Sequence, residues 1–242
     1  MLTPVDPTCQ LDTSVLEVRL IREHTFVPRN LVAGHVALDL VNTVTARNAD
    51  PVDWLAGYPR LLQWATLTGE FDQAALRALQ RRSAADPHAA AFALRTTRDL
   101  REALLAVITA MISDVAPPAD GLRRIERVWK DAVTHANLTL ADGTVRPHLS
   151  IETSGLEYLN HQLALRSLEL LQALPLARTR VCPGLRCGWL FIDRSKGGQR
   201  RWCDMATCGN VAKSARHYQR ARDTRVAALS RESSSGSGTV TK

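Results

Sequence analysis

Residues 182–208, CPGLRCGWLFIDRSKGGQRRWCDMATC, contain four cysteines in the spacing C-x4-C-x15-C-x4-C. A structural zinc ion takes four soft ligands at the corners of a tetrahedron, and two short cysteine loops supply such a set. We therefore predict a Zn²⁺ site formed by Cys182, Cys187, Cys203 and Cys208. Because four thiolates leave no open coordination position, the metal is expected to be structural and not catalytic.

Two other interpretations of the four cysteines stay open. An iron–sulfur cluster uses the same ligands, and the residues could also be four unrelated reduced thiols. The amino-terminal sequence lacks the basic start and apolar stretch of a secretion signal, so clustered cysteines favour a metal over disulfides. The fifth cysteine, Cys9, lies far from the cluster in the sequence.

The segment between the two cysteine pairs indicates how they meet. GWLFID is typical of a strand and Gly197-Gly198 of a turn, which predicts a hairpin that brings the two cysteine loops together. Trp189, Phe191 and Trp202 are expected to form the small core of this module. About fifty residues with so few large apolar side chains need a metal to hold a fold.

A basic helix is predicted directly after the last cysteine. Gly209 permits a tight turn, Asn210 is a favoured N-cap, and the helix continues to about residue 229. Four basic residues share one face of it, at positions i, i+3, i+4 and i+7: Lys213, Arg216, His217 and Arg220. On another face, Val211 and Ala215 are small enough to approach the metal core.

The charge of the chain is concentrated in this region. Residues 178–225 contain twelve Lys and Arg but only three acidic residues, whereas the whole chain has a net charge of +7. Such asymmetry suggests a polyanionic partner, and a basic helix anchored by a zinc site could lie in a DNA major groove. The alternatives are a solvated basic face and, for Arg200 and Arg201, neutralisation of the negatively charged Zn–thiolate centre in place of phosphate contact.

The remaining sequence predicts an α+β fold: a mainly helical front domain with a small β-hairpin, followed by the four-cysteine module and its basic helix. A strand is predicted over residues 14–21 and a hairpin around Asp142-Gly143 within 137–152. The predicted helices of the front domain are 34–46, 59–70, 85–115, 120–136 and 154–174. The predicted divisions are a leader over 1–30, the front domain over 31–178, the zinc module over 179–229 and a disordered tail over 230–242.

A polar stripe interrupts the apolar pattern of the first helix. His35, Asp39 and Asn42 lie at i, i+4 and i+7. They could hold a small-molecule effector, although the interpretation that we favour is that they satisfy buried backbone groups. Because no nucleophile–base pair or phosphate-binding glycine loop is apparent, we expect no enzymatic activity.

The cysteine segment and two stretches of the front domain resemble a known bacterial protein family. CGWLFIDRSKGGQRRWCDMATCGNVAK is similar to the CGNR zinc finger of bacterial proteins, and VALDLVNTV with YPRLLQWATLTG resembles the ABATE domain that accompanies it. The two resemblances cover about residues 31–225 and imply a stress-linked bacterial transcription regulator whose zinc ligands are the four clustered cysteines. The family is named after the motif Cys-Gly-Asn-Arg. This chain has the first three residues of the motif, but Val211 stands in place of the arginine.

The leading prediction is therefore a zinc-dependent, DNA-binding regulator. Its expected nucleic-acid residues are Arg200, Arg201, Lys213, Arg216, His217 and Arg220. Double-stranded DNA is the expected partner, with a small-molecule effector and a homodimer as further predictions, and no membrane association. The expected location is the cytoplasm, at the nucleoid. The second hypothesis is a protein–protein interaction module, and a third is an enzyme that uses Asp39.

Overall fold

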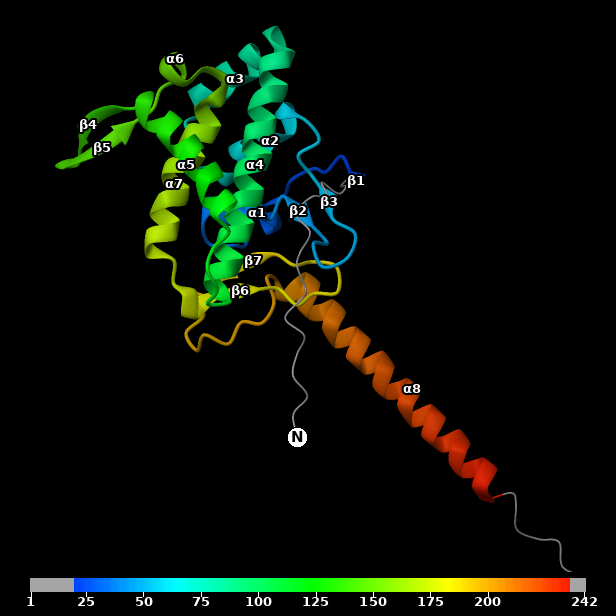
Figure 1. Ribbon diagram of the computed structural model, residues 1–242. Coiled ribbons are helices and arrows are strands. Elements are labelled where there is room, and N and C mark those ends of the chain that lie inside the picture. The colour runs from blue at the N-terminus through cyan, green and yellow to red at the C-terminus, as the bar shows by residue number, and fades with distance from the viewer. Residues whose placement is uncertain (1–19, 236–242) are drawn as a thin grey trace, which may run out of the picture.

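The computed structural model describes residues 20–235 and consists of a helical body from which one long helix projects (Figure 1). The central helix, α4 (Pro87–Ile112), lies against α5 (Ala119–Thr134), α7 (Tyr158–Ala173) and α2 (Tyr58–Thr68). α3 (Gln73–Ala85) packs beside α2, and α1 (Val36–Val41) packs against α4 and α7. Short helical turns complete the body: η1 (Pro28–Asn30), α6 (Ile151–Ser154), η2 (Gly155–Glu157) and η3 (Leu176–Arg178).

Three small sheets accompany the helices. In the first, β1 (Leu20–Ile21) runs parallel to β3 (Val52–Asp53), which also pairs antiparallel with β2 (Val44–Thr45). The second is the hairpin of β4 (Asn137–Ala141) and β5 (Thr144–His148), and the third joins β6 (Thr179–Val181) to β7 (Leu190–Ile192). The element content confirms the predicted fold class.

Local sequence signals explain where the helices begin and end. The Asp86 carboxylate accepts a hydrogen bond from the Ala89 N–H at 2.9 Å and caps α4, whose first residue, Pro87, needs no donor partner. Asp72 caps α3 in the same way. α2 ends at Gly69, which adopts the left-handed conformation at φ 68°.

Several predicted elements differ from the observed ones. α3 was not predicted, because its polar, alanine-rich sequence carries only a narrow apolar stripe of Leu76 and Leu79. The helix predicted over 34–46 is shorter, since α1 ends at Val41 and the chain continues into β2. The helix predicted from residue 154 is observed as α7, which begins four residues later at Tyr158, because Gly155 turns the chain at φ 56°. Residues 14–19 of the predicted first strand lie outside the described residues.

The hairpin at Asp142-Gly143 is confirmed, with φ 50° and 72° at these two residues. Its register pairs Leu138 with Pro147 and Leu140 with Val145. Side chains at these positions share one face, so one side of the hairpin is apolar and yet exposed to solvent. In Figure 1 this hairpin stands out from the helical body.

No helix within residues 20–235 is both long and apolar enough to cross a lipid bilayer.

Candidate zinc site and basic helix

The first cysteine pair is held by the β6–β7 hairpin. The Cys182 N–H donates to the Trp189 carbonyl at 2.8 Å, and the Cys187 N–H donates to the Gly184 carbonyl at 3.2 Å. The cysteine loop is thus the turn of this hairpin. The predicted hairpin was placed wrongly: GWLFID does contain a strand, but it pairs with the residues before Cys182, not with those after Gly197-Gly198.

Asp193 organises the segment that leads to the second cysteine pair. Its carboxylate accepts hydrogen bonds from the Ser195 N–H and hydroxyl and from the Arg200 N–H at 2.8 Å. These bonds, with the one from the Ser195 hydroxyl foremost, lower the pKa of Asp193. Gly198 turns the chain at φ 61° close to the Arg178 side chain. This irregular loop returns Cys203 to the first pair.

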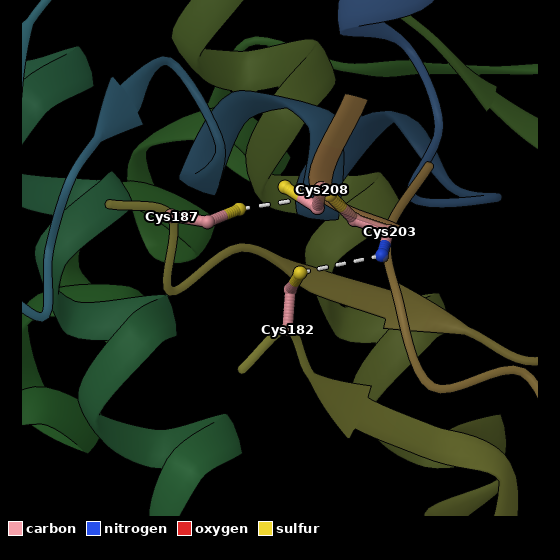
Figure 2. Close-up of side chains that lie close together, drawn as sticks. All are labelled: Cys182, Cys187, Cys203 and Cys208. Atoms are coloured by element: carbon pink, nitrogen blue, oxygen red, sulfur yellow. Dashed lines mark hydrogen bonds between the residues drawn. The ribbon is translucent and has the colours of Figure 1, made fainter. Parts of the chain in front are cut away.

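The four sulfur atoms converge at one point (Figure 2). Cys187 Sγ lies 3.5 Å from Cys203 Sγ, which lies 3.7 Å from Cys208 Sγ. Sulfurs bound to one zinc ion at about 2.3 Å in a tetrahedron are separated by about 3.8 Å, so the donor set fits zinc. Cys182, Cys187 and Cys203 are buried and Cys208 is half-buried.

Two further features suit a metal-bound thiolate cluster. The Cys203 N–H donates a hydrogen bond to Cys182 Sγ at 3.4 Å, a contact that stabilises a thiolate at this position. A Cβ atom at Gly184 would lie 2.9 Å from Cys208 Sγ, so only glycine lets the two loops approach this closely. The predicted aromatic core is confirmed, since Trp189 and Phe191 are buried with the cysteines and Trp202 packs on them.

The helix after the cluster starts differently from the prediction. The Asp204 carboxylate, not Asn210, caps it by accepting from the Ala206 N–H at 3.0 Å. One wide turn, η4 (Met205–Gly209), then leads into α8 (Asn210–Ser235), which extends beyond the predicted end at residue 229. Gly209 is the last residue of this wide helical turn and not part of a tight turn, and a Cβ there would require the end of the Met205 side chain to move.

The predicted basic face is present on α8. Lys213, Arg216, His217 and Arg220 are all exposed, and the helix projects away from the body (Figure 1). The expected approach of Val211 and Ala215 to the zinc core is wrong, because both are exposed to solvent. Among the described residues, α8 packs mainly against η4, which contains Cys208.

Arg200 and Arg201 occupy different environments. The Arg200 guanidinium donates to the carbonyls of Trp202, Val32 and Cys203 and lies over the Phe191 ring, 4.5 Å from its centroid. Arg200 thus braces the cysteine loop against the front part of the chain. Arg201 is exposed and lies over the Trp202 ring at 5.9 Å.

The zinc module is hydrogen-bonded to residues 42–48 of the front part. The Cys187 carbonyl accepts from the Arg47 N–H at 3.1 Å, and the Cys187 N–H donates to Asn48 Oδ1 at 3.0 Å. Asn48 Nδ2 also donates to the Gly184 carbonyl at 2.7 Å. Trp189 Nε1 donates to the Val44 carbonyl at 3.1 Å, and the Trp54 ring meets the Trp189 ring edge-on.

The polar stripe of α1 serves the same connection. Asn42 makes two hydrogen bonds with the backbone of Leu190 in β7, from Nδ2 to the carbonyl at 2.8 Å and from the N–H to Oδ1 at 2.9 Å. Asp39 Oδ1 accepts from the Ala33 N–H at 3.0 Å, and His35 Nδ1 caps α1 by accepting from the Ala37 N–H at 3.2 Å. The favoured interpretation, that these side chains satisfy backbone groups, is in accord with these contacts.

Burial raises the pKa of Asp39 to about 7, with the Glu70 charge adding to the effect and the hydrogen bonds from the Ala33 and Val32 backbone opposing it. Burial also lowers the pKa of His35, and the Arg166 charge acts in the same direction.

A buried charge network, not foreseen from the sequence, continues the connection to α4. Arg101 binds both oxygens of Asp53, at 2.9 and 2.7 Å, and the Glu102 carboxylate at 2.8 Å. Glu102 in turn binds Arg47 at 3.0 Å, and the Arg47 N–H contacts the Cys187 carbonyl. The only sequence signal was charge on an otherwise apolar face of the longest helix.

A cavity of about 970 Å³ lies between α2, α3 and α4. Its lining is mostly apolar and includes Tyr58, Leu62 and Leu94, with the arginines Arg77, Arg95 and Arg98 and no acidic residue. A smaller groove of about 490 Å³ lies beside His35, Arg178 and Arg194.

Comparisons with protein families agree with this architecture. Residues 34–179 match the ABATE family, described as "Putative stress-induced transcription regulator", and residues 178–221 match the CGNR zinc finger. The finger match includes all four cysteines, which therefore form a zinc site. No functionally curated protein shows significant similarity to the chain.

Proposed function

The chain belongs to the ABATE family of transcription regulators and carries a CGNR zinc finger, and from this premise we propose that it binds duplex DNA through α8. A regulator of this kind has a non-enzymatic role. In this proposal the zinc site fixes the first turn of α8, and the exposed side chains of α8 contact the DNA. The protein would then act in the cytoplasm, at the nucleoid.

The basic face of α8 is the observation that carries the proposal. Lys213, Arg216, His217 and Arg220 are exposed, and the sequence from Met205 to Arg220 contains no acidic residue. The 26 residues of α8 span about 39 Å at 1.5 Å per residue, about the length of one turn of duplex DNA. A long, exposed, cationic helix with one fixed end can enter a major groove without moving the body.

The predicted nucleic-acid-binding residues fall into two groups, those that are exposed and one that is bound within the protein. Lys213, Arg216, His217, Arg220 and the exposed Arg201 remain in the proposed interface. Arg200 is left out, because its guanidinium is committed to three backbone carbonyls and the Phe191 ring. Because Val211 stands where the family has arginine, Lys213 and Arg216 would make the first DNA contacts along α8.

The test is the salt dependence of binding by the zinc-loaded protein to a random duplex library. Replacing Lys213, Arg216 and Arg220 with glutamine should weaken binding and reduce the slope of log K against log salt by about 0.9 for each lost phosphate contact. The matched control replaces three exposed cations of α5 with glutamine: Arg123, Arg127 and Lys130. An unchanged slope in the α8 variant, or an equal reduction in the control, would refute the assignment of this face.

A protein–protein module is the second candidate. The exposed Val211 and Tyr218 on α8 favour it, because apolar side chains on an interaction helix can anchor an acidic partner. Zinc-loaded protein that fails to bind duplex DNA at low salt would support this candidate over the first.

We place the proposed effector in the cavity between α2, α3 and α4. His35, Asp39 and Asn42 are engaged with backbone groups, whereas this cavity has apolar walls and three arginines. These features fit an organic anion with an apolar body. An Arg77→Gln/Arg95→Gln variant should lose thermal stabilisation by aliphatic or aromatic carboxylates, and the corresponding amines should stabilise neither protein.

The proposed homodimer forms through the apolar face of the β4–β5 hairpin. Leu138, Leu140, Val145 and Pro147 carry no charge that would repel an identical face, and two copies can meet about a two-fold axis. Light scattering should show a dimer that a Leu138→Lys/Leu140→Lys variant converts to monomer. A monomeric wild-type protein at micromolar concentration would refute this contact.

A further inference from the structure

A second cluster of metal-binding side chains lies where α5 ends beside α7. Asp131 and His135 are one helical turn apart at the end of α5, and His161 faces them from α7. The donor atoms of the three residues all lie within 4.8 Å of one another. The group contains none of the zinc-finger cysteines.

The distances within the cluster suit a small ion. His161 Nε2 lies 2.9 Å from Asp131 Oδ2, and His135 Nδ1 lies 3.5 Å from Asp131 Oδ1. Nitrogen and oxygen ligands at about 2.1 Å from a tetrahedral zinc ion are about 3.4 Å apart. Small side-chain rotations therefore bring the three donors to ligand distances.

The electrostatic surroundings favour a cation. The cluster lies at the carboxyl end of α5, where the unpaired carbonyls give the helix its negative pole. The Asp131 carboxylate lies at the same place, 2.9 Å from His161 Nε2. Negative charge is thus already present before any ligand binds.

The two histidine rings lie against each other. They stack with centroids 4.8 Å apart and an interplanar angle of 26°, which brings an imidazole from α7 beside the one that follows α5. His135 Nδ1 also lies 2.8 Å from the Asp131 carbonyl oxygen and 3.2 Å from Thr134 Oγ1, so a metal ion would compete with these contacts at the end of α5.

We propose that Asp131, His135 and His161 bind a divalent transition-metal ion of the zinc class, separate from the four-cysteine site. Two imidazoles and one carboxylate are a donor set that Zn²⁺, Ni²⁺ and Co²⁺ share. Three protein ligands leave at least one position for water or for a ligand from a partner, unlike the closed cysteine site. The ion links α5 to α7 at the base of the β4–β5 hairpin, since α5 continues into β4 after Ala136.

Metal stoichiometry of the full-length protein tests the proposal. The protein is first loaded with one zinc ion per chain, and further Zn²⁺ is then titrated by calorimetry and checked by elemental analysis. The wild type should take up a second equivalent. An Asp131→Asn variant and a His135→Ala variant should bind that equivalent at least about 100-fold more weakly, because each lacks a direct ligand.

Asp131 and His135 are suitable positions because their side chains are 52% and 39% exposed, and Asp131→Asn keeps an acceptor oxygen for the buried His161. A His88→Ala variant removes an exposed histidine from α4 and should retain the second equivalent. Thermal unfolding gives an independent measurement, since added Zn²⁺ should raise the Tm of the wild type and of His88→Ala only. Uptake of a single equivalent by the wild type, or unchanged affinity in both ligand variants, would overturn the proposal.

Discussion

Asn42→Ala is the sharpest test of how the zinc module is joined to the helical body. Asn42 satisfies both the N–H and the carbonyl of Leu190, and both residues are fully buried. The alanine variant leaves these two backbone groups in the core without their partner. Each unsatisfied group costs about 1–3 kcal/mol, so the free energy of unfolding should fall by about 2–6 kcal/mol.

The loss can be measured by thermal unfolding of the zinc-loaded protein, followed by circular dichroism. For a chain of this size, 1 kcal/mol corresponds to about 2–4 °C in Tm, so a loss near 3 kcal/mol lowers the Tm by about 6–12 °C. Asn137→Ala, at an exposed position in β4, is the matched control and should leave the Tm unchanged. If Asn42 were instead an effector ligand, its variant would lose effector binding at a wild-type Tm. The smallest loss expected from the two unpaired groups, about 2 kcal/mol, would lower the Tm by about 4 °C. A Tm within about 2 °C of the wild type would therefore refute the structural role.

Three further outcomes are expected. Zinc removal should reduce hydrogen-exchange protection in α1 as well as in residues 182–208, because Leu190 and Ile192 belong to the main core; a loss confined to residues 182–208 would contradict this. Burial raises the pKa of Asp39 to about 7 in the folded state, against about 3.9 for an unperturbed aspartate, so the native state binds the proton more tightly. Stability therefore falls as pH rises from about 4 to 7, by at most about 4 kcal/mol. Asp39→Asn keeps an acceptor for the Ala33 N–H and should flatten that part of the stability–pH curve, which denaturant titrations at several pH values would measure. Because the α8 side chains from Lys213 to Arg220 are exposed and pack on no other element, the helicity measured by circular dichroism should increase on binding duplex DNA, and an unchanged spectrum would argue against this coupling.

The zinc site was predictable from the sequence because its constraints are local. Four cysteines in two short loops define a tetrahedral donor set whatever residues surround them. In the structure the four sulfur atoms do lie close together. The basic face of α8 was predictable for a similar reason, since residues at i, i+3, i+4 and i+7 share a face of any α-helix. The Asp142-Gly143 turn also follows from the residues alone.

Features that depend on distant partners could not be predicted. Asn42 and Leu190 are 148 residues apart, and no local pattern relates an amide on α1 to the backbone of β7. The choice of Asp204 over Asn210 as the helix cap depended on where the chain leaves Cys203, because both residues are good caps in isolation. The pairing of β7 with β6 likewise followed from contacts on both sides of the cysteine loop.

The path from the proposed effector cavity to the zinc site explains how a ligand could affect α8. Arg98 lines the cavity and donates to the Leu55 carbonyl, and its Nε lies 3.5 Å from Asp53. Asp53 is fixed by Arg101, whose neighbour Glu102 binds Arg47, and the Arg47 N–H contacts the Cys187 carbonyl. Every step is a hydrogen bond or ion pair between packed elements, and no flexible linker intervenes. If the proposed effector displaces Arg98, we expect this chain of contacts to shift the Cys187 loop and with it the direction of α8. An Arg98→Gln variant that keeps the wild-type response of DNA binding to the effector would contradict this route.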